Sequence, residues 1–542
     1  MNRKYVFVLL AALALMVGLA APAAAQGKTL TISWPQEPDS LNPMYTTMTF
    51  AGYTYQLFLA ATWEFDENYE LTPILVSEIP SADNGGISED GTTFTLKLKD
   101  GLTWSDGDPL DSADFVFTYE MYMSDKNTPL GRTPWDQFES IEAPDPTTVV
   151  IKFAEPYAPW SGQLSLRPIP EHILRPVFEA DGTLDNAAWN SNPTVGSGAF
   201  VLQEWDRGNF ARFAPNASFA MGAPKIETLV VTFIPDDQAY VASLEAGDSE
   251  LGTFIDPRDV PRLQDAGLDV RLIPSGYNEG WFFNASPERA HPAMTDVRVR
   301  KAIALGFDRF SMVEDLLGGV LPVGHSYWEQ TPYANPDLPP VPYDPEQAKA
   351  LLDEAGWVDT NGNGIRDKDG VELELRFVST TRQIRQDMKA LAQQQLGEIG
   401  IGISIENYES NVFFNGYAEG GPAATGQYDI ATWSSSPGGF PDPDTNRFQC
   451  DQIPSDDNPV GDNWNYYCDP ALDELFVKSR VTTDFDERVA IYHQIDKLIY
   501  DSYIWINTWY DADIWVVGSR VQNARLNGTT PFFDVVNWDV AG

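Results

Sequence analysis

The stretch "LELRFVSTTRQIRQDMKALAQQQLGEIGIGISIE", residues 373–406, decides the fold class of this chain. Apolar side chains alternate with other residues over 373–377 and again over 401–405, as they do in strands that bury one face. Between these two runs, the segment from Met388 to Ile399 is expected to form a helix. A strand, a helix and a second strand in so short a run predict a βαβ unit, so the second half of the chain is predicted to be α/β.

The same half of the chain carries further helix signals. Residues 296–317 have apolar side chains at helical spacing, and Gly318 is expected to end that helix. In "YDPEQAKALLDEAG", residues 343–356, Asp344 is expected to cap the start of a helix and the last glycine to stop it. Another helix is predicted for residues 486–501. Long helices between strands fit the α/β class.

The first half of the chain has a different pattern. Alternating apolar residues predict strands at 94–98 and 149–153. The stretch "TWSDGDPLDSADFVFTYEMY" is expected to be a loop and the start of a helix, with Asp111 or Ser112 as the cap. The segment from about 70 to 190 is therefore predicted to be an α+β unit of its own.

The beginning of the chain has the features of a secretory signal peptide. Two basic residues precede an apolar run over 6–21, and alanines at 23–25 supply a cleavage site. We expect removal of residues 1–25, export of the chain, and a mature start at Gln26. The alternative is a single membrane anchor, although the run is short for a spanning helix. No cysteine lies near the cleavage site, so no lipid anchor is expected.

Composition restricts the possible functions. Forty-three percent of the 542 residues are hydrophobic, which excludes a disordered chain. The formal net charge is −44, and such a surface repels phosphate backbones, so binding of nucleic acid is excluded. The charge does not identify a ligand, because solubility outside the cell explains it equally well.

The only two cysteines, Cys450 and Cys468, enclose the polar stretch "CDQIPSDDNPVGDNWNYYC". In an oxidising compartment such a pair normally forms a disulfide. On the loop-entropy argument this bridge would contribute roughly 3 kcal/mol to stability. Catalytic or metal-binding thiols are the alternative, but no histidine lies nearby in the sequence.

The common catalytic signatures are missing from the sequence. It contains no G-x-S-x-G elbow, H-E-x-x-H pair, phosphate-binding loop or dinucleotide fingerprint. We therefore predict no catalytic residues, no cofactor and no enzymatic activity. A secreted glycoside hydrolase with two carboxylates remains the alternative, because spacing among 79 acidic residues cannot exclude it.

One stretch resembles a calcium-binding loop. In "DTNGNGIRDKDG" the residues Asp359, Asn361, Asn363 and Asp367 occupy the first, third, fifth and ninth ligand positions. The twelfth position should hold a bidentate glutamate, but it is Gly370. We favour a polar hairpin turn and predict no metal site, with calcium binding as the open alternative.

Five stretches together resemble the extracellular solute-binding proteins of the oligopeptide/dipeptide class, which deliver ligands to ATP-binding-cassette importers. They occur in the order of that family and span nearly the whole mature chain. These stretches are "EPDSLNP" near the mature start, "DGTTFTLKLKDGLTWSDGDPLDSADFVFTYE", "GSGAFVLQEW" from 196, "DVRVRKAIALGFDR" from 296 and "YDPEQAKALLDEAG" from 343.

The resemblance implies a two-lobed, hinged, periplasmic-binding-protein-like α/β fold with an extra α+β subdomain in the first lobe. We expect lobe I at 26–284, with the subdomain at about 70–190, lobe II at 285–507, and a return to lobe I at 508–542. A peptide or an oligosaccharide would be held between the lobes of a monomer in the periplasm or outside the cell. Its partners would be the permease and ATPase subunits of an importer.

The resemblance also implies three walls for the ligand pocket, and for each aromatic residue the alternative is packing in the core. The first wall follows the "LNP" segment, the second is the strand in "SGYNEGWFFN", and the third is "YDIATWSSSPGGFPDP" at 428–443, where small residues after the tryptophan are expected to leave space before its ring. The candidates are Thr47, Met48, Thr49, Tyr277, Trp281 and Trp433.

The third wall departs from the family pattern. In peptide-binding relatives an aspartate three residues after the pocket tryptophan pairs with the ligand's α-ammonium, but the residue three after Trp433 is Ser436. Either an insertion lets Asp442 or Asp444 supply the charge, or the ligand has no ammonium, as in an oligosaccharide or a blocked peptide. We therefore predict that free di- and tripeptides bind weakly and that N-acetylation changes their affinity little.

Overall fold

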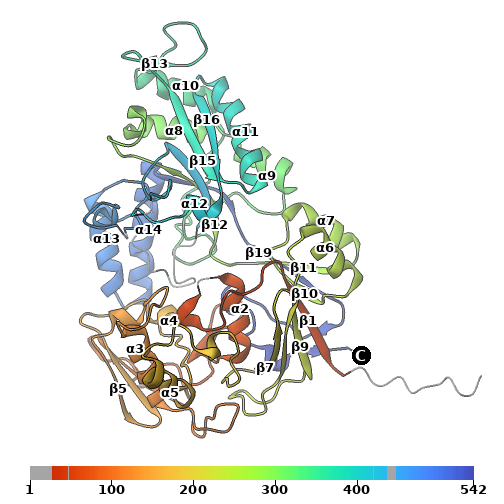
Figure 1. The fold of residues 1–542 in the computed structure, drawn as a ribbon. Helices are drawn as coiled ribbons and strands as arrows, with labels where there is room; N and C mark the ends of the chain where they lie inside the picture. Colours follow the sequence, from red (N-terminus) through yellow and green to blue (C-terminus); the bar gives the residue numbers. More distant parts are fainter. Residues whose placement is uncertain are drawn as a thin grey trace, which may run out of the picture.

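The computed structural model describes residues 27–46, 48–418, 420–435, 443, 447–459 and 461–541. The chain forms two lobes, each built on its own β-sheet (Figure 1). None of the helices in these described ranges is long and apolar enough to cross a membrane. The predicted signal peptide lies outside the described residues.

Lobe I is built on a seven-stranded sheet in the order β11-β19-β10-β1-β9-β8-β7. Its strand β1 (Thr29–Trp34) runs parallel to β9 (Thr228–Phe233) and to β10 (Leu251–Gly252). Strand β19 (Asp513–Val517) lies antiparallel between β10 and β11, so the C-terminal part of the chain belongs to lobe I. The remaining elements of this sheet and its cover are β7 (Phe200–Asp206), β8 (Phe210–Pro215), β11 (Asp269–Ile273), α6 (Asp237–Ala246) and α7 (Val260–Asp265).

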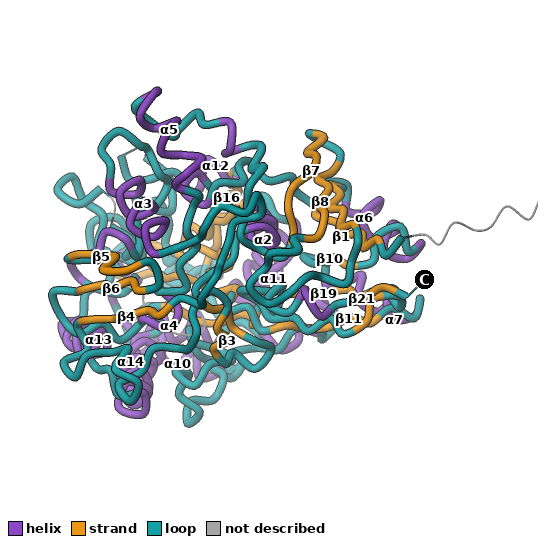
Figure 2. The backbone as a smooth tube through the Cα atoms, turned by 90° about the horizontal axis from the view of Figure 1, so that it is seen from below, coloured by secondary structure: helices purple, strands orange, loops and turns teal. Residues whose placement is uncertain are grey.

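The insert, residues 70–190, forms a second, three-stranded sheet in the order β4-β6-β5. Figure 2 shows this sheet well apart from the seven-stranded sheet. The helix predicted here starts as expected, because Asp111 accepts a hydrogen bond from Ala113 N and completes a capping box with Asp114. The elements of the insert are β3 (Leu71–Pro73), β4 (Thr93–Lys97), α3 (Ser112–Met123), β5 (Ser140–Asp145), β6 (Thr148–Lys152), α4 (Trp160–Gln163) and α5 (Glu171–Asp181), with β2 (Trp63–Phe65) just before it.

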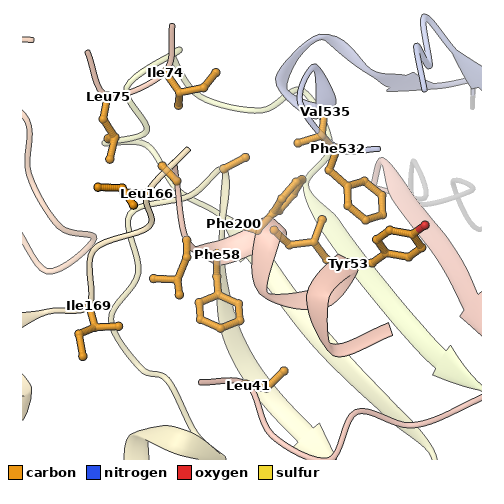
Figure 3. Packing of buried hydrophobic residues seen from close by; sticks show 14 of the residues in the cluster. Leu41, Tyr53, Phe58, Ile74, Leu75, Leu166, Ile169, Phe200, Phe532 and Val535 are labelled. Carbon is orange, nitrogen blue, oxygen red and sulfur yellow. The ribbon is translucent and has the colours of Figure 1, made fainter. Parts of the chain in front are cut away.

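The insert shares its hydrophobic core with the rest of lobe I. Helix α2 (Thr49–Phe58) lies at the centre of this core, among side chains from the insert and from the C-terminal segment (Figure 3). The predicted α+β unit thus has its own sheet, but it does not have its own hydrophobic core. The residues labelled in Figure 3 include Tyr53 and Phe58 of α2, Ile74, Leu75, Leu166 and Ile169 of the insert, and Phe532 and Val535 of the C-terminal segment.

Lobe II is built on a five-stranded sheet in the order β16-β15-β17-β12-β18. Strands β15 (Glu374–Thr380) and β16 (Gly402–Tyr408) are parallel and are joined by α11 (Gln383–Glu398), which confirms the predicted βαβ unit. Strand β17 (Ile430–Ser435) is parallel to β15. The other elements of lobe II are β12 (Asn278–Phe283), α8 (Val297–Leu305), α9 (Arg309–Leu317), α10 (Pro345–Glu354), β13 (Asp367–Lys368), β14 (Val371–Glu372), α12 (Ser410–Phe413), α13 (Pro470–Val481), α14 (Phe485–Ser502) and β18 (Trp505–Tyr510).

Both predicted boundaries between the lobes differ from the structure. Strand β12, predicted in lobe I, pairs with β17 and β18 inside the second sheet, and β18 extends three residues past the predicted end of lobe II at 507. The chain therefore crosses between the lobes at 274–277 and at 511–512. All six residues of each strand are buried, so neither strand shows the alternation that marks a strand in sequence.

The helix predicted over 296–317 is two helices, α8 and α9, with a break at residues 306–308. Asp308 caps α9 by accepting a hydrogen bond from Ser311 N at 3.0 Å. The chain is also crowded at Gly306, where a Cβ would lie 2.5 Å from Ile399 Cδ1. Helical spacing continues through the break, so the periodicity did not reveal it.

Two predictions about polar loops can be compared with the structure. Cys450 and Cys468 form a disulfide with a Cα–Cα distance of 4.6 Å, which confirms the predicted bridge. The calcium-like stretch ends in the hairpin turn between β13 and β14, as favoured above, and its first eight residues form the loop before β13. Its carboxylates accept hydrogen bonds from within the loop: Asp359 from Gly362 N and Gly364 N, and Asp367 from the Thr360 hydroxyl.

Candidate ligand site between the lobes

The two crossings between the lobes lie side by side and are tied together by hydrogen bonds. Tyr510 Oη accepts from Ser275 N at 3.0 Å, and Asp511 N donates to Tyr277 O at 3.0 Å. Ser275 Oγ also donates to Asp511 O at 3.1 Å. These bonds join the crossings into a paired hinge that belongs to both lobes.

A buried carboxyl group connects this hinge to lobe I. Tyr53 Oη of α2 donates to Asp513 Oδ2 at 2.9 Å. Burial raises the pKa of Asp513 to about 7; the hydrogen bond from Tyr53 opposes this shift, and the charge of Asp511 adds to it. Helix α2 begins directly after the predicted ligand loop, so this bond connects that loop to the hinge.

On the lobe II side, the first residues of α11 and the middle of the sheet form a charged wall. The fully buried carboxylate of Glu279 receives two hydrogen bonds from Arg385, at 2.9 and 2.8 Å, and a third from Thr432 Oγ1 at 2.8 Å. This bidentate contact satisfies the buried charge. Arg382 is half exposed, and its Nη1 lies 3.9 Å from Glu279 and 4.0 Å from Asp511.

On the lobe I side, the loop after β10 presents an aromatic ring and an ion pair. Phe254 is 48% exposed and has a φ of 61°, which is an uncommon backbone conformation for a bulky residue. Its ring packs on Phe50 with centroids 4.9 Å apart. Arg258 and Asp256 form an ion pair at 2.6 Å. This loop therefore offers both apolar and charged contacts.

Several residues predicted for the pocket lie at this hinge. Met48 and Thr49 are half-buried at the start of α2, and Tyr277 is 38% exposed on the first crossing. Their contact with a ligand stays a prediction. The predicted residues Thr47, Ser436 and Asp442, together with the alternative Asp444, lie outside the described residues.

The two predicted tryptophans are core residues in the structure. Trp281 is fully buried and stacks on Phe307 with ring centroids 4.5 Å apart, which corrects its assignment to the pocket. Trp433 is 3% exposed, and its ring lies parallel to that of Phe282 at 3.8 Å. The space expected before the ring of Trp433 is therefore filled on that face. Neighbouring strands β17 and β12 bring Trp433 and Phe282 together, whereas Phe307 lies in the break between α8 and α9, so neither contact was visible in the sequence.

Several residues at the hinge were not predicted from the sequence, and Phe254, Arg382 and Asp511 are among them. The two aspartates in "TWYDADIW" were a usable signal, because Asp511 and Asp513 interrupt an otherwise apolar strand. No comparable signal marks Phe254, since its positive φ and its exposure follow from the folded loop.

The lobes also touch on the flank opposite the hinge, where the insert meets the end of α13. Ala158 N donates a hydrogen bond to Arg480 O at 2.9 Å. A Cβ placed on Gly91 would lie 3.0 Å from Thr483 Cγ2, so these two segments of the chain are in close contact. Figure 1 shows α4 near the lower end of the α13–α14 pair. The lobes therefore contact each other both at the hinge and where the insert meets the end of α13.

Comparisons with known proteins agree with this architecture. A model of the bacterial extracellular solute-binding proteins, family 5 Middle, matches residues 57–451. The chain is 26% identical to the oligopeptide-binding protein AppA of Bacillus subtilis, over 95% of this chain and 92% of the relative. It is 24% identical to the probable di/tripeptide-binding protein 5 of Pseudomonas aeruginosa, over 94% and 95% of the two chains.

The fold is also similar to solved structures. AppA from Bacillus subtilis in complex with a nonapeptide superposes with a TM-score of 0.75 at 23% identity, covering 95% of this chain and 99% of that one. The substrate-binding protein CtaP from Listeria monocytogenes superposes with a TM-score of 0.79 at 25% identity, covering 95% and 100%. Both similarities extend over both lobes.

Proposed function

The chain belongs to the family 5 bacterial extracellular solute-binding proteins, and we propose that it captures a peptide between its two lobes and delivers it to an ATP-binding-cassette importer. The paired hinge carries this proposal. Two lobes that the chain connects through adjacent crossings can rotate about them, and a ligand that contacts both lobes stabilises the closed form. The importer's permease and ATPase would then receive the closed, loaded protein.

The chemistry of the walls favours a peptide over an oligosaccharide. The site presents exposed aromatic rings, Phe254 and Tyr277, and charges of both signs, which suit the side chains and ends of a peptide. The hydroxyls of Ser434, Ser435 and Ser436 would be the groups that bind an oligosaccharide, but Ser435 is buried and hydrogen-bonded to Tyr327 Oη at 2.6 Å. Ser434 Oγ is bonded to Asp511 at 2.9 Å. Two of the three expected sugar-binding hydroxyls thus already have protein partners.

Relatives support the same ligand class. AppA of Bacillus subtilis is named as an oligopeptide-binding protein and the Pseudomonas aeruginosa relative as a probable di/tripeptide-binding protein, and neither supports the glycoside hydrolase alternative. We infer that the chain has no enzymatic activity and works as an exported monomer that begins near Gln26 and carries no lipid. N-terminal sequencing of secreted protein that still began at Met1 would contradict this inference.

The decisive test is identification of the ligand that the protein carries. Native mass spectrometry of protein purified without refolding should reveal a bound peptide that is recovered unaltered after incubation. Small-angle scattering should then give a smaller radius of gyration with this peptide than without it. Recovery of an oligosaccharide would change the ligand class, and recovery of a cleaved ligand would restore the enzyme hypothesis.

A further inference from the structure

The charges at the hinge are not evenly matched. Glu279 has a bidentate arginine partner in Arg385, so its charge is satisfied. Arg382 stands between two carboxylates at 3.9 and 4.0 Å, beyond hydrogen-bond distance from each, with half of its side chain exposed. Of these two carboxylates, that of Asp511 is left without a hydrogen-bonded cation.

The partners of Asp511 are neutral. Its Oδ2 accepts from Ser434 Oγ at 2.9 Å and its Oδ1 from Trp509 Nε1 at 3.3 Å. No lysine or arginine in the described part of the chain approaches this carboxylate closer than 4.0 Å. The segments 436–442 and 444–446, which follow Ser434, contain no lysine or arginine either. A carboxylate can accept about four hydrogen bonds, so Asp511 retains room for a charged donor.

The position of Asp511 suits contact with a ligand. Its side chain is 20% exposed, so it is shielded but reachable. It lies on the second crossing, beside exposed Tyr277 on the first, and it bonds Ser434 at the end of the strand that leads into the third predicted wall. A cation bound there would contact the hinge itself, where the lobes meet.

We propose that Asp511 is a specificity-determining residue that binds a cationic group of the ligand, which in a peptide is the free α-ammonium. This inference rests on the proposed function and names the group that the site recognises. The carboxylate that binds the ammonium group would then lie on the hinge, whereas in peptide-binding relatives it follows the pocket tryptophan. The inference also revises the expectation that a neutral Ser436 leaves free peptides weakly bound. Asp442 or Asp444 is the competing source of the charge.

The test uses the full mature chain and random-sequence peptides, from tripeptides to nonapeptides, supplied as an equal mixture of free and N-acetylated forms. Peptides retained by the protein are quantified by mass spectrometry. The wild type should enrich free over acetylated peptides about tenfold, and Asp511→Asn should abolish that enrichment. Asp369→Asn is the matched control: it removes the same charge from an exposed hairpin turn with φ 53°, a conformation that asparagine tolerates, and should keep the enrichment.

Each other outcome is informative. Equal retention of free and acetylated peptides by the wild type would overturn the role of Asp511 and leave peptide binding intact. Enrichment that survives Asp511→Asn but is lost in Asp442→Asn or Asp444→Asn would assign the charge to the third wall and overturn the proposal. Retention of no peptide of either kind would overturn the proposed function and this inference together. Matching thermal melting of Asp511→Asn and wild type excludes a folding defect as the cause.

Discussion

The lobes meet on two flanks that are built differently. On the hinge flank, the chain itself runs between the lobes, and hydrogen bonds tie the crossings to each other and to α2. On the insert flank, the contacts between described residues include the backbone hydrogen bond from Ala158 to Arg480 and the close approach of Gly91 to Thr483. The first flank must persist through any rotation of the lobes, whereas the second can separate. From this difference we expect the hinge flank to stay intact and the insert flank to separate when the lobes open.

The largest effect is expected from removing the cation that satisfies Glu279. Arg385→Ala would leave a fully buried carboxylate without its bidentate partner, and breaking such a pair costs about 3–5 kcal/mol. Urea denaturation should show this loss in the free energy of unfolding.

The control for that experiment is Arg382→Ala. Its side chain is half exposed and makes only long contacts, so its removal should cost less than about 1 kcal/mol. Equal losses in the free energy of unfolding for the two variants would mean that the buried pair of Glu279 and Arg385 contributes no special stability beside the hinge.

A smaller effect is expected on the insert flank. Gly91→Ala places a Cβ against Thr483 at a residue with φ 68°, so it should both strain the backbone by about 1–2 kcal/mol and push the flank apart. Small-angle scattering of the peptide-loaded protein should show a larger radius of gyration than for the wild type.

Gly85→Ala separates these two contributions. Gly85 also has a positive φ, of 72°, but no atom lies within 4 Å of its Cβ position. It should lower stability to a similar extent and leave the radius of gyration unchanged. If both variants open the protein equally, the insert flank does not hold the lobes together.

The smallest effect concerns pH at the hinge. The pKa of Asp513 is about 7, so this group is neutral at lower pH and gains a negative charge beside Asp511 as pH rises through 7. Affinity for a free peptide should therefore rise about threefold between about pH 6 and pH 7, where the α-ammonium stays charged. The titratable groups facing Asp513 are Tyr53, Tyr69, Tyr277, Tyr510 and Asp511.

Calorimetry at the two pH values measures this change. Asp513→Asn removes the titrating group, so its affinity should not depend on pH in this interval. An affinity that falls as pH rises, or a rise that persists in Asp513→Asn, would show that Asp513 is not the group responsible.

The sequence predicted much of the fold but less of the site. Capping residues such as Asp111 and Asp344 and the period of the apolar residues located helices and strands, because these signals act over a few neighbouring residues. The site predictions were poorer because the contacts of a side chain in the site depend on segments that are distant in the sequence. A buried tryptophan and a ligand-stacking tryptophan have the same sequence signature, and Trp281 proved to belong to the core.

The sequence by itself determined the α/β class, the βαβ unit, the disulfide and, through family resemblance, the two-lobed architecture. Only the tertiary structure decided that β12 and β18 belong to lobe II, and that Glu279 meets Arg385 across 106 positions of sequence. Likewise, Asp511 lies beside Ser434 only because both crossings and the end of β17 lie at the same end of the neighbouring strands β17, β12 and β18. Local order is set by neighbouring residues, whereas burial and charge pairing at the hinge depend on segments that meet only after both lobes have folded.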